Sequence, residues 1–263
     1  MTIESLPDLM TSPASPLLTI KGAIATITLR RPATHNKIEP EDVGVLRGYL
    51  AELNANRDVR VIVFESTGKS FSSGFDLGRL GASAASGENQ FQQFTDEIEN
   101  ARAITIAKLH GPVYGGSTDL TLSCDFRIGV EGMRMFMPAA RLGLHYYPHG
   151  LRRWVSRLGL GNAKRLFLTS RTIEAEEMLR IGYLDALVPP ESLDANVNQW
   201  IEDLLAQAPI PLVTMKATLN EIGRQQYDEA SAQAAHVASL KSRDIGEALA
   251  AFAEKRTPKF NGT

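Results

Sequence analysis

This chain of 263 residues has little of what marks many specialised protein classes. It has one cysteine, Cys124, so an intramolecular disulfide and a multi-cysteine metal site are excluded. Its formal net charge is −2, and no overall field favours a nucleic acid or an anionic membrane as partner. No apolar run reaches bilayer length, and residues 1–10 lack the basic residues that begin a secretory signal. We therefore expect a cytoplasmic protein that binds neither nucleic acid nor membrane.

The length and composition suit one large α/β domain, alone or with a helical appendage, because 43% of the residues are hydrophobic. Three prolines within residues 1–16 predict a loose N-terminal arm. From residue 17, strand and helix patterns alternate, which favours parallel βαβ units with right-handed crossovers. We divide the chain into the arm at 1–16, a core at 17–207 and a C-terminal helical region at 208–263.

Hydrophobic periodicity gives the elements of the core. Apolar runs predict strands at 17–20, 23–29, 59–64 and 104–109, and an apolar stripe predicts a helix at 39–56. Residues 81–89 are rich in Gly, Ala and Ser and predict a mobile loop. Residues 149–182 and 194–207 are expected to be helices with no intervening strand, and residues 209–255 are expected to be helical throughout.

The most informative segment is 110–120, HGPVYGGSTDL, which joins a predicted buried strand to a predicted buried helix. The adjacent Gly115 and Gly116 let backbone N–H groups approach a ligand closely, at the positive end of the helix dipole. Asp119 lies in the first turn of that helix. The segment can therefore stabilise a developing oxyanion, although a tight turn with close packing of helix on strand is the alternative.

A second strand runs into a loop of the same character. The strand at 59–64 is followed by a Ser- and Gly-rich loop that ends in FSSGFD at 71–76. Two such loops can each offer one N–H group to the same carbonyl oxygen, which is the geometry of an oxyanion hole.

In this order and spacing, FSSGFD at 71–76 and GGSTDL at 115–120 resemble the crotonase (enoyl-CoA hydratase/isomerase) superfamily. The resemblance extends to LRRPATHN at 29–36, SCDFRI at 123–128 and positions between 248 and 260, so it covers about residues 17–260. It implies an α/β fold with a ββα spiral core and a C-terminal helical region for trimerisation. A homotrimer, or a dimer of trimers, is the assembly that the resemblance implies.

The resemblance also implies a chemistry. The superfamily forms an enolate from an acyl-CoA thioester, with coenzyme A as part of the substrate and no separate cofactor. The backbone N–H groups of Phe75 and Gly116 take the position of the two donors that hold the thioester oxygen. Asp119 stands where a hydratase has its first glutamate. Its alternative role is that of an acidic residue that interacts with the helix dipole.

The position of the family's second acid is a departure. The segment 135–143, MFMPAARLG, aligns with the family's second-acid segment and places Ala139 at that position. Alanine cannot transfer a proton. A hydration in which one acid holds water and the other handles the α-proton is therefore not expected in its standard form.

The loop at 143–151, GLHYYPHGL, offers other proton-handling groups. Its pattern resembles the methylmalonyl-CoA decarboxylase branch, with Tyr146 at the active-site tyrosine of that branch, although Phe75 stands where that branch has a histidine. Tyr146 and His145 are thus candidate catalytic residues, with His149 as a further candidate. The alternatives are ring packing for the tyrosine and a polar surface position for the histidines.

Binding of coenzyme A is assigned by resemblance. Its candidate residues are Thr34, His35, Ser73, Phe75, Asp76 and Lys255. Arg152 and Arg153 begin a helix and could meet phosphates, but a solvated helix face is the favoured interpretation. We expect no metal site, because the histidines do not form a known ligand spacing.

We therefore predict an enoyl-CoA hydratase/isomerase-like enzyme that stabilises the enolate of an acyl-CoA substrate. The alternatives are an acyl-CoA decarboxylase or hydrolase that uses Tyr146 or a loop histidine, and a CoA-binding homologue without catalysis.

Overall fold

The computed structural model describes residues 14–76, 78 and 89–263. The strands are β1 (Leu17–Lys21), β2 (Ile24–Leu29), β3 (Val61–Ser66), β4 (Ile104–Leu109), β5 (Val113–Tyr114), β6 (Phe126–Val130), β7 (Arg134–Phe136), β8 (Ile173–Glu174) and β9 (Ala186–Val188). The α-helices are α2 (Pro40–Ala55), α4 (Gln90–Glu99), α5 (Gly116–Ser123), α6 (Pro148–Thr169), α7 (Ala175–Arg180), α8 (Leu193–Leu205), α9 (Pro209–Gly223), α10 (Glu229–Leu240) and α11 (Arg243–Glu254). Short 3-10 helices are η1 (Pro32–Thr34), η3 (Ala140–Leu142) and η4 (Pro190–Ser192).

The larger sheet has the strand order β1-β2-β3-β4-β6-β9. The hairpin β1–β2 is antiparallel, and the pairs from β2 onward are parallel. The central strands β3 and β4 are buried along most of their length. Helices cover both faces of these strands, which explains why their sequences are continuous apolar runs rather than alternating patterns. A smaller sheet has the order β5-β7-β8.

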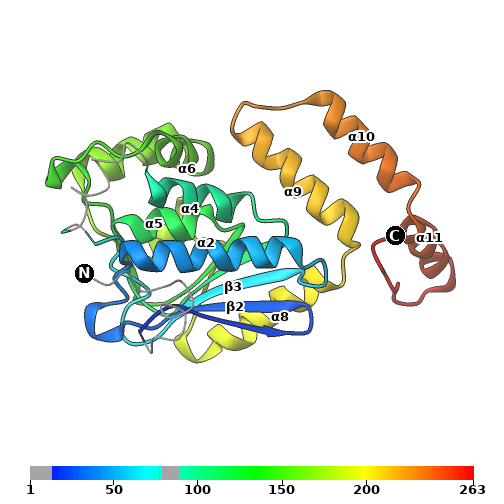
Figure 1. Ribbon diagram of the computed structural model, residues 1–263, viewed down its shortest axis with the longest axis horizontal. Coiled ribbons are helices and arrows are strands. Elements are labelled where there is room, and N and C mark those ends of the chain that lie inside the picture. The colour runs from blue at the N-terminus through cyan, green and yellow to red at the C-terminus, as the bar shows by residue number, and fades with distance from the viewer. Residues whose placement is uncertain (1–13, 77, 79–88) are drawn as a thin grey trace, which may run out of the picture.

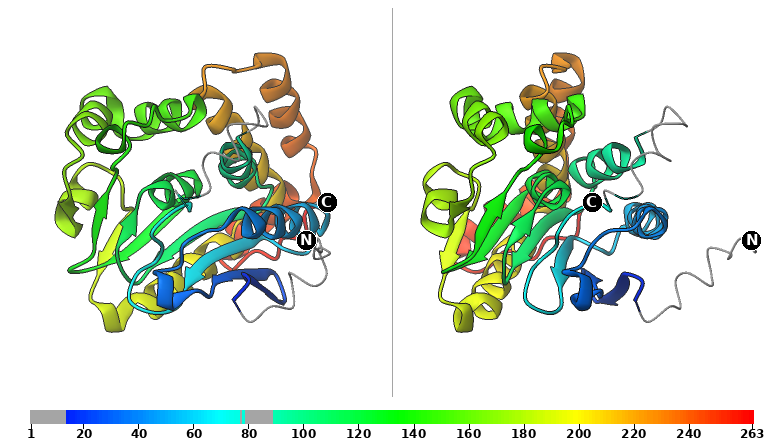
Figure 2. Two further views of the ribbon diagram at one scale, coloured as in Figure 1. Left: turned by 60° about the vertical axis from the view of Figure 1, so that its left-hand side comes forward. Right: turned by 90° about the vertical axis from the view of Figure 1, so that its left-hand side faces the viewer.

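The helices form layers on either side of the larger sheet (Figure 1). Helix α8 packs against β3, β4 and β6. Helices α2, α4 and α5 lie on the other side of the strands, and the right-hand view in Figure 2 shows α8 in yellow opposite α2 and α4. Helix α4 contacts α2, α5 and α6, so it is central to the layer that carries the candidate site.

The α/β fold and the C-terminal helical region predicted from the sequence are confirmed. The strands expected at 17–20, 23–29, 59–64 and 104–109 and the helix at 39–56 are present, with small shifts of their ends. Most of the predicted arm, and residues 81–88 of the predicted mobile loop, lie outside the described residues. At the end of the arm, Ser15 is buried, and its carbonyl oxygen accepts a hydrogen bond from Arg30 Nε at 2.8 Å.

The prediction of uninterrupted helix at 149–182 is wrong. Helix α6 ends at Thr169, and β8 precedes the short helix α7. The expected absence of a strand before residue 194 is also wrong, because β9 pairs with β6. These strands are two or three residues long and pair with partners distant in sequence. Tertiary pairing, not a local pattern, therefore creates them.

The three C-terminal helices extend along one side of the molecule (Figure 1). Helix α10 packs on α9, and α9 contacts α6. Breaks after Gly223 and Leu240 interrupt the helix predicted over 209–255. The trimerisation that the resemblance implies for this region stays a prediction.

Candidate active site

The two glycine-containing loops meet at the carboxyl ends of β3 and β4. Gly74 has a φ of +88°, and a Cβ atom there would lie 2.6 Å from the Gly116 nitrogen. A Cβ atom on Gly116 would lie 3.3 Å from the Phe75 nitrogen. Ser117 Oγ donates to the Ser72 carbonyl oxygen at 2.7 Å and ties the start of α5 to the first loop. Glycine is thus required where one backbone packs directly on the other.

The Phe75 and Gly116 N–H groups lie at this junction. The flanking N–H groups are occupied: Gly74 N–H donates to Ser72 Oγ at 3.0 Å, and Asp76 N–H donates to the Ile38 carbonyl oxygen at 2.9 Å. Within the described part of the chain, the N–H groups of Phe75 and Gly116 donate to no acceptor. Gly116 is the first residue of α5, where helix N–H groups have no intrahelical partner.

Asp119 is fully buried in the first turn of α5. Its Oδ2 atom accepts hydrogen bonds from the Tyr147 hydroxyl and from Arg153, each at 2.6 Å. Its Oδ1 atom is buried and has no hydrogen-bond partner among the described residues. Asp119, the carboxylate predicted to handle protons, is therefore enclosed: two protein donors hold Oδ2, and Oδ1 is buried without a partner among the described residues.

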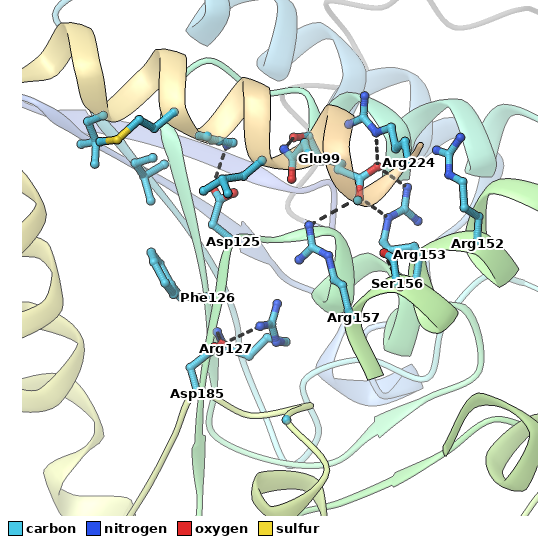
Figure 3. Close-up of a pocket in the computed structure, with 18 of the residues that line it drawn as sticks. Glu99, Asp125, Phe126, Arg127, Arg152, Arg153, Ser156, Arg157, Asp185 and Arg224 are labelled. Atoms are coloured by element: carbon cyan, nitrogen blue, oxygen red, sulfur yellow. Dashed lines mark hydrogen bonds and ion pairs between the residues drawn. The ribbon is translucent and has the colours of Figure 1, made fainter. Parts of the chain in front are cut away.

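Arg153 is the cation that makes this burial possible. Its side chain is inaccessible and forms ion pairs with Asp96 at 2.8 Å, Glu99 at 3.2 Å and Asp119 at 2.6 Å. Glu99 also pairs with Arg157 at 3.4 Å and with Arg224 at 3.2 Å. Figure 3 shows these arginines gathered around Glu99.

The interpretation of Arg153 as part of a solvated helix face is therefore wrong. Helix α6 packs against α4 and α5, and Arg153 lies on the face that meets them. Three carboxylates from those helices compensate its charge, which permits a buried guanidinium. Arg152, in contrast, is partly exposed, which agrees better with a solvated helix face.

Burial and charge act in opposite directions on the two buried carboxylates. Burial raises the pKa of Asp119 by more than Arg153 and the Tyr147 hydroxyl lower it. Burial also acts to raise the pKa of Glu99, but Arg153, Arg157 and Arg224 outweigh it and lower that pKa. Asp119 is thus the more readily protonated of the two acids, relative to its ordinary value.

Tyr146 and Tyr147 form a stacked pair beside Asp119. Their ring centroids lie 4.2 Å apart, and the Tyr146 hydroxyl donates to the Tyr147 hydroxyl at 3.1 Å. Burial and the nearby Asp119 raise the pKa of both hydroxyls well above their usual value, so both stay protonated at neutral pH. A Cβ atom on Gly150 would lie 2.5 Å from the Tyr146 ring, so this glycine gives the pair its room.

The structure brings Tyr146 into the Asp119 cluster but does not bring His145 there. His145 is exposed, and its Nδ1 atom lies 2.8 Å from the carbonyl oxygen of its neighbour Tyr146. His149 reaches the cluster's edge, with Nδ1 at 2.5 Å from Asp96 Oδ2. Ala139 is buried where the family's second acid was expected and supplies no titratable group.

Five of the six residues assigned to coenzyme A lie together. Ser73 N–H donates to the His35 carbonyl oxygen at 2.7 Å, and Ser73 Oγ lies 3.3 Å from the Thr34 carbonyl oxygen. Asp76 accepts a hydrogen bond from Lys37 Nζ at 2.7 Å, next to Phe75. Lys255 caps α11, which lies at the other end of the molecule from α5 (Figure 1).

A cleft of about 560 Å³ lies on the far side of the Arg153 cluster, between α6, α9 and β6 (Figure 3). Arginines, Lys216 and apolar side chains of α9 line it. It contains none of the residues predicted from the sequence to bind or act on substrate. We therefore place the candidate active site where the two loops meet, and not in this cleft. The backbone N–H groups of Phe75 and Gly116, which have no acceptor among the described residues, lie at that junction.

The structure also bears on metal binding, on membrane spans and on the single thiol. No group of three or more His, Cys, Asp or Glu side chains that could hold a metal ion occurs among residues 14–76, 78 and 89–263. Over the same part of the chain, every helix is too short or too polar to cross a membrane. Cys124 is buried, and burial raises the pKa of its thiol to about 12, as expected for an inert thiol.

Comparison with known proteins decides the family. The model of the enoyl-CoA hydratase/isomerase family matches residues 19–263. The chain belongs to this family. The predicted superfamily is thereby confirmed. Because the members of this family act on CoA thioesters, membership implies that the chain is an enzyme.

Relatives extend over nearly the whole chain. Human enoyl-CoA hydratase domain-containing protein 2, mitochondrial, is 31% identical over 91% of this chain and 86% of its own length. The short-chain-enoyl-CoA hydratase of Clostridium acetobutylicum is 26% identical over 91% of this chain and 95% of its own. The solved enoyl-CoA hydratase of Bacillus anthracis superposes with a TM-score of 0.86 at 26% identity, covering 95% of this chain and 100% of its own. The crotonase-like fold is thereby confirmed.

Sequence reasoning missed Tyr147 and Arg153 as partners of Asp119. The loop pattern favours Tyr146 over its neighbour Tyr147, and the favoured interpretation of Arg153 is a solvated helix face. Their hydrogen bonds to Asp119 span 28 and 34 residues. The one local signal is that Tyr147 caps the start of α6 and Arg153 lies in its second turn.

Proposed function

We propose that this protein binds an acyl-CoA thioester and stabilises the enolate of its acyl group between the N–H groups of Phe75 and Gly116. The supporting observation is that these two N–H groups lie at the junction of two packed loops and donate to no acceptor among residues 14–76, 78 and 89–263. Preformed donors of this kind act on the charge that develops in the transition state, and each contributes ~10²–10³ in rate. Thr34, His35 and Ser73 border the same loops, which supports a coenzyme A site there.

The reaction that follows enolate formation is proposed to differ from two-acid hydration. Ala139 supplies no second acid, and Asp119 has no exposed atom. We expect hydration of crotonyl-CoA to be about 10²–10⁴ slower than in an enzyme with two glutamates, because one general acid–base group is absent. Absorbance at the enoyl thioester band measures this rate. Hydration at the full rate of a two-glutamate enzyme would contradict our account of the site.

A decarboxylase or hydrolase is the second candidate. Its support is the Tyr146–Tyr147 pair bonded to Asp119, which offers hydroxyl groups where the second carboxylate is missing. Loss of CO₂ would itself generate the enolate and would need no base to remove a carbon-bound proton. Turnover of malonyl-type CoA esters with release of CO₂, in the absence of α-hydrogen exchange, would favour this candidate.

Calorimetry with butyryl-CoA, crotonyl-CoA, methylmalonyl-CoA and free coenzyme A tests the proposal. At least one thioester is expected to bind more tightly than free coenzyme A, because only a thioester places an oxygen between the two N–H groups. A ligand of this kind should also raise the melting temperature, and the rise should grow with the logarithm of its concentration once that concentration exceeds the dissociation constant. No binding of any of the four would overturn the proposal and would favour a protein that has lost coenzyme A binding.

A further inference from the structure

The burial of Asp119 raises the question of how it could reach a bound acyl group. Its side chain has no accessible surface, and one oxygen is already held by two donors at 2.6 Å. The Tyr147 hydroxyl is one of these donors, and Tyr147 is partly exposed. A hydrogen-bonded path for a proton therefore leads from Asp119 to the Tyr147 oxygen.

Phe91 connects Tyr147 to the loop that carries Gly116. The Phe91 ring lies 3.1 Å from the position of a Cβ atom on Gly116, so Phe91 packs directly against this glycine. Tyr147 contacts Phe91 edge to face, with ring centroids 6.3 Å apart. One aromatic side chain, Phe91, therefore contacts both Gly116 and the Tyr147 ring.

The hydrogen bonds of the Tyr147 oxygen leave room for one more partner. Its proton points to Asp119, and one lone pair accepts from Tyr146 at 3.1 Å. Thr95 Oγ1 lies at the limit of 3.5 Å and is 3.0 Å from the Gln92 carbonyl oxygen. Because a phenol oxygen has two lone pairs, one remains for a proton from a ligand.

We propose that Tyr147 is a catalytic residue that passes protons between the acyl group and Asp119. This inference rests on the proposed function. The α-proton of the acyl group moves to the Tyr147 oxygen while the Tyr147 proton moves to Asp119 Oδ2. The electron pair of the broken C–H bond becomes the enolate held by Phe75 and Gly116. The reverse transfer returns the proton to carbon, so no oxidant or further reactant is needed.

The electrostatics of the cluster suit this exchange. A free tyrosinate is not formed at neutral pH, because burial and Asp119 raise the pKa of Tyr147 well above 10. Burial raises the pKa of Asp119, which makes the carboxylate a better proton acceptor than an exposed aspartate. Arg153 stays charged throughout, since Asp96 and Glu99 still face it when Asp119 is neutral. Arg153 is thus a positioning residue for Asp119.

Exchange of the α-hydrogens of butyryl-CoA in D₂O, followed by NMR, tests the relay in the full-length protein. Tyr147→Phe and Asp119→Asn should each slow exchange by about 10² or more, and the double variant should be no slower than either alone, because residues that act as a unit are not additive. Tyr146→Phe removes a donor to Tyr147 without cutting the path, and should cost less than about tenfold. The matched control is Tyr227→Phe, since Tyr227 is 49% exposed on the C-terminal region, and its exchange rate should equal that of wild type.

The pH profile separates the relay from a structural role. Wild-type exchange should fall at low pH as Asp119 becomes protonated, at a pH above the ordinary aspartate range. In Tyr147→Phe the residual exchange should lose this acid limb, because Asp119 no longer communicates with the acyl group. Tyr147→Gln keeps a donor to Asp119, but an amide cannot take a proton from carbon while giving one to Asp119, so this variant should behave as Tyr147→Phe does even if the phenylalanine variant is unstable.

Three results would overturn the relay. Exchange in Tyr147→Phe within threefold of wild type, with Asp119→Asn inactive, would show that Asp119 acts directly. A Tyr147 variant that keeps the acid limb would show the same. Losses that add in the double variant would show two independent residues. If wild type binds no acyl-CoA, the proposed function fails first; if wild type binds and exchanges, any of these three results removes the relay alone.

Discussion

The residues at 17–207 and those at 208–263 differ in which side chains they bury and which they expose. In the core, charges lie inside the protein: Arg153 is 1% exposed and Arg127 is 4% exposed, and each pairs with carboxylates of the same chain. In the C-terminal region, apolar side chains lie outside: Phe252 is 85% exposed, and Leu219 and Leu249 are each 66% exposed. The core therefore pairs these buried charges within one chain, whereas the most exposed apolar side chain, Phe252, lies in the C-terminal region.

The exposed apolar residues of the C-terminal region follow helical stripes. Met215, Leu219 and Ile222 share one face of α9, and Leu249 and Phe252 share one face of α11. A monomeric soluble protein seldom leaves contiguous surface of this kind uncovered. We propose that copies of this chain cover these faces for one another in a homotrimer or a dimer of trimers.

The strongest test of the core is removal of Arg153. Arg153→Met should destabilise the protein by about 3–5 kcal/mol, because it leaves Asp119 and Glu99 as buried carboxylates without their shared cation. Urea unfolding monitored by circular dichroism measures the loss. Arg256→Met is the matched control in the C-terminal region, where Arg256 pairs with Glu247 at the surface, and its unfolding midpoint should not change. Similar midpoints for both variants would show that the core cluster contributes no more than a surface pair.

The second test compares two glycines. Gly74→Ala should lower turnover of the best thioester by about 10²–10³, because the new Cβ atom would lie 2.6 Å from the Gly116 nitrogen and separate the two donors. Gly246→Ala places a Cβ atom in open space on α11 and should stabilise the protein by up to about 1 kcal/mol with unchanged turnover. Steady-state kinetics and thermal melting measure both. Full turnover by Gly74→Ala would show that the loop junction is not the reacting site.

The third test addresses the apolar faces. Leu249→Asp combined with Phe252→Asp should reduce the mass measured by light scattering to that of a monomer, while circular dichroism stays that of a folded protein. Leu17→Asp, at a 38% exposed position of β1, is the control and should leave the mass unchanged. A wild-type protein that is monomeric at micromolar concentration would show that the exposed stripes are not an interface.

Local sequence predicted the loops of the site but not its interior. Phe75 and Gly116 could be proposed as donors by resemblance, because each follows a strand in a loop of small residues whose order and spacing match a family motif. Tyr147 and Arg153 could not, since an arginine beside polar residues at a helix start looks solvated unless three carboxylates from two other helices surround it. The strands β8 and β9 could not be predicted either, because their hydrogen-bond partners lie on distant segments.

The sequence by itself determined the α/β alternation, the two glycine junctions, the missing acid at Ala139 and the membership of the family. Each depends on residues that are neighbours in the chain or on an ordered series of motifs. The tertiary structure alone decided that Asp119 is enclosed, that Tyr147 and Arg153 donate to it, and that exposed His145 bonds to its neighbour's carbonyl oxygen instead. Burial and ion pairing are properties of groups brought together from separate helices, and no local pattern of residue types records which groups will meet.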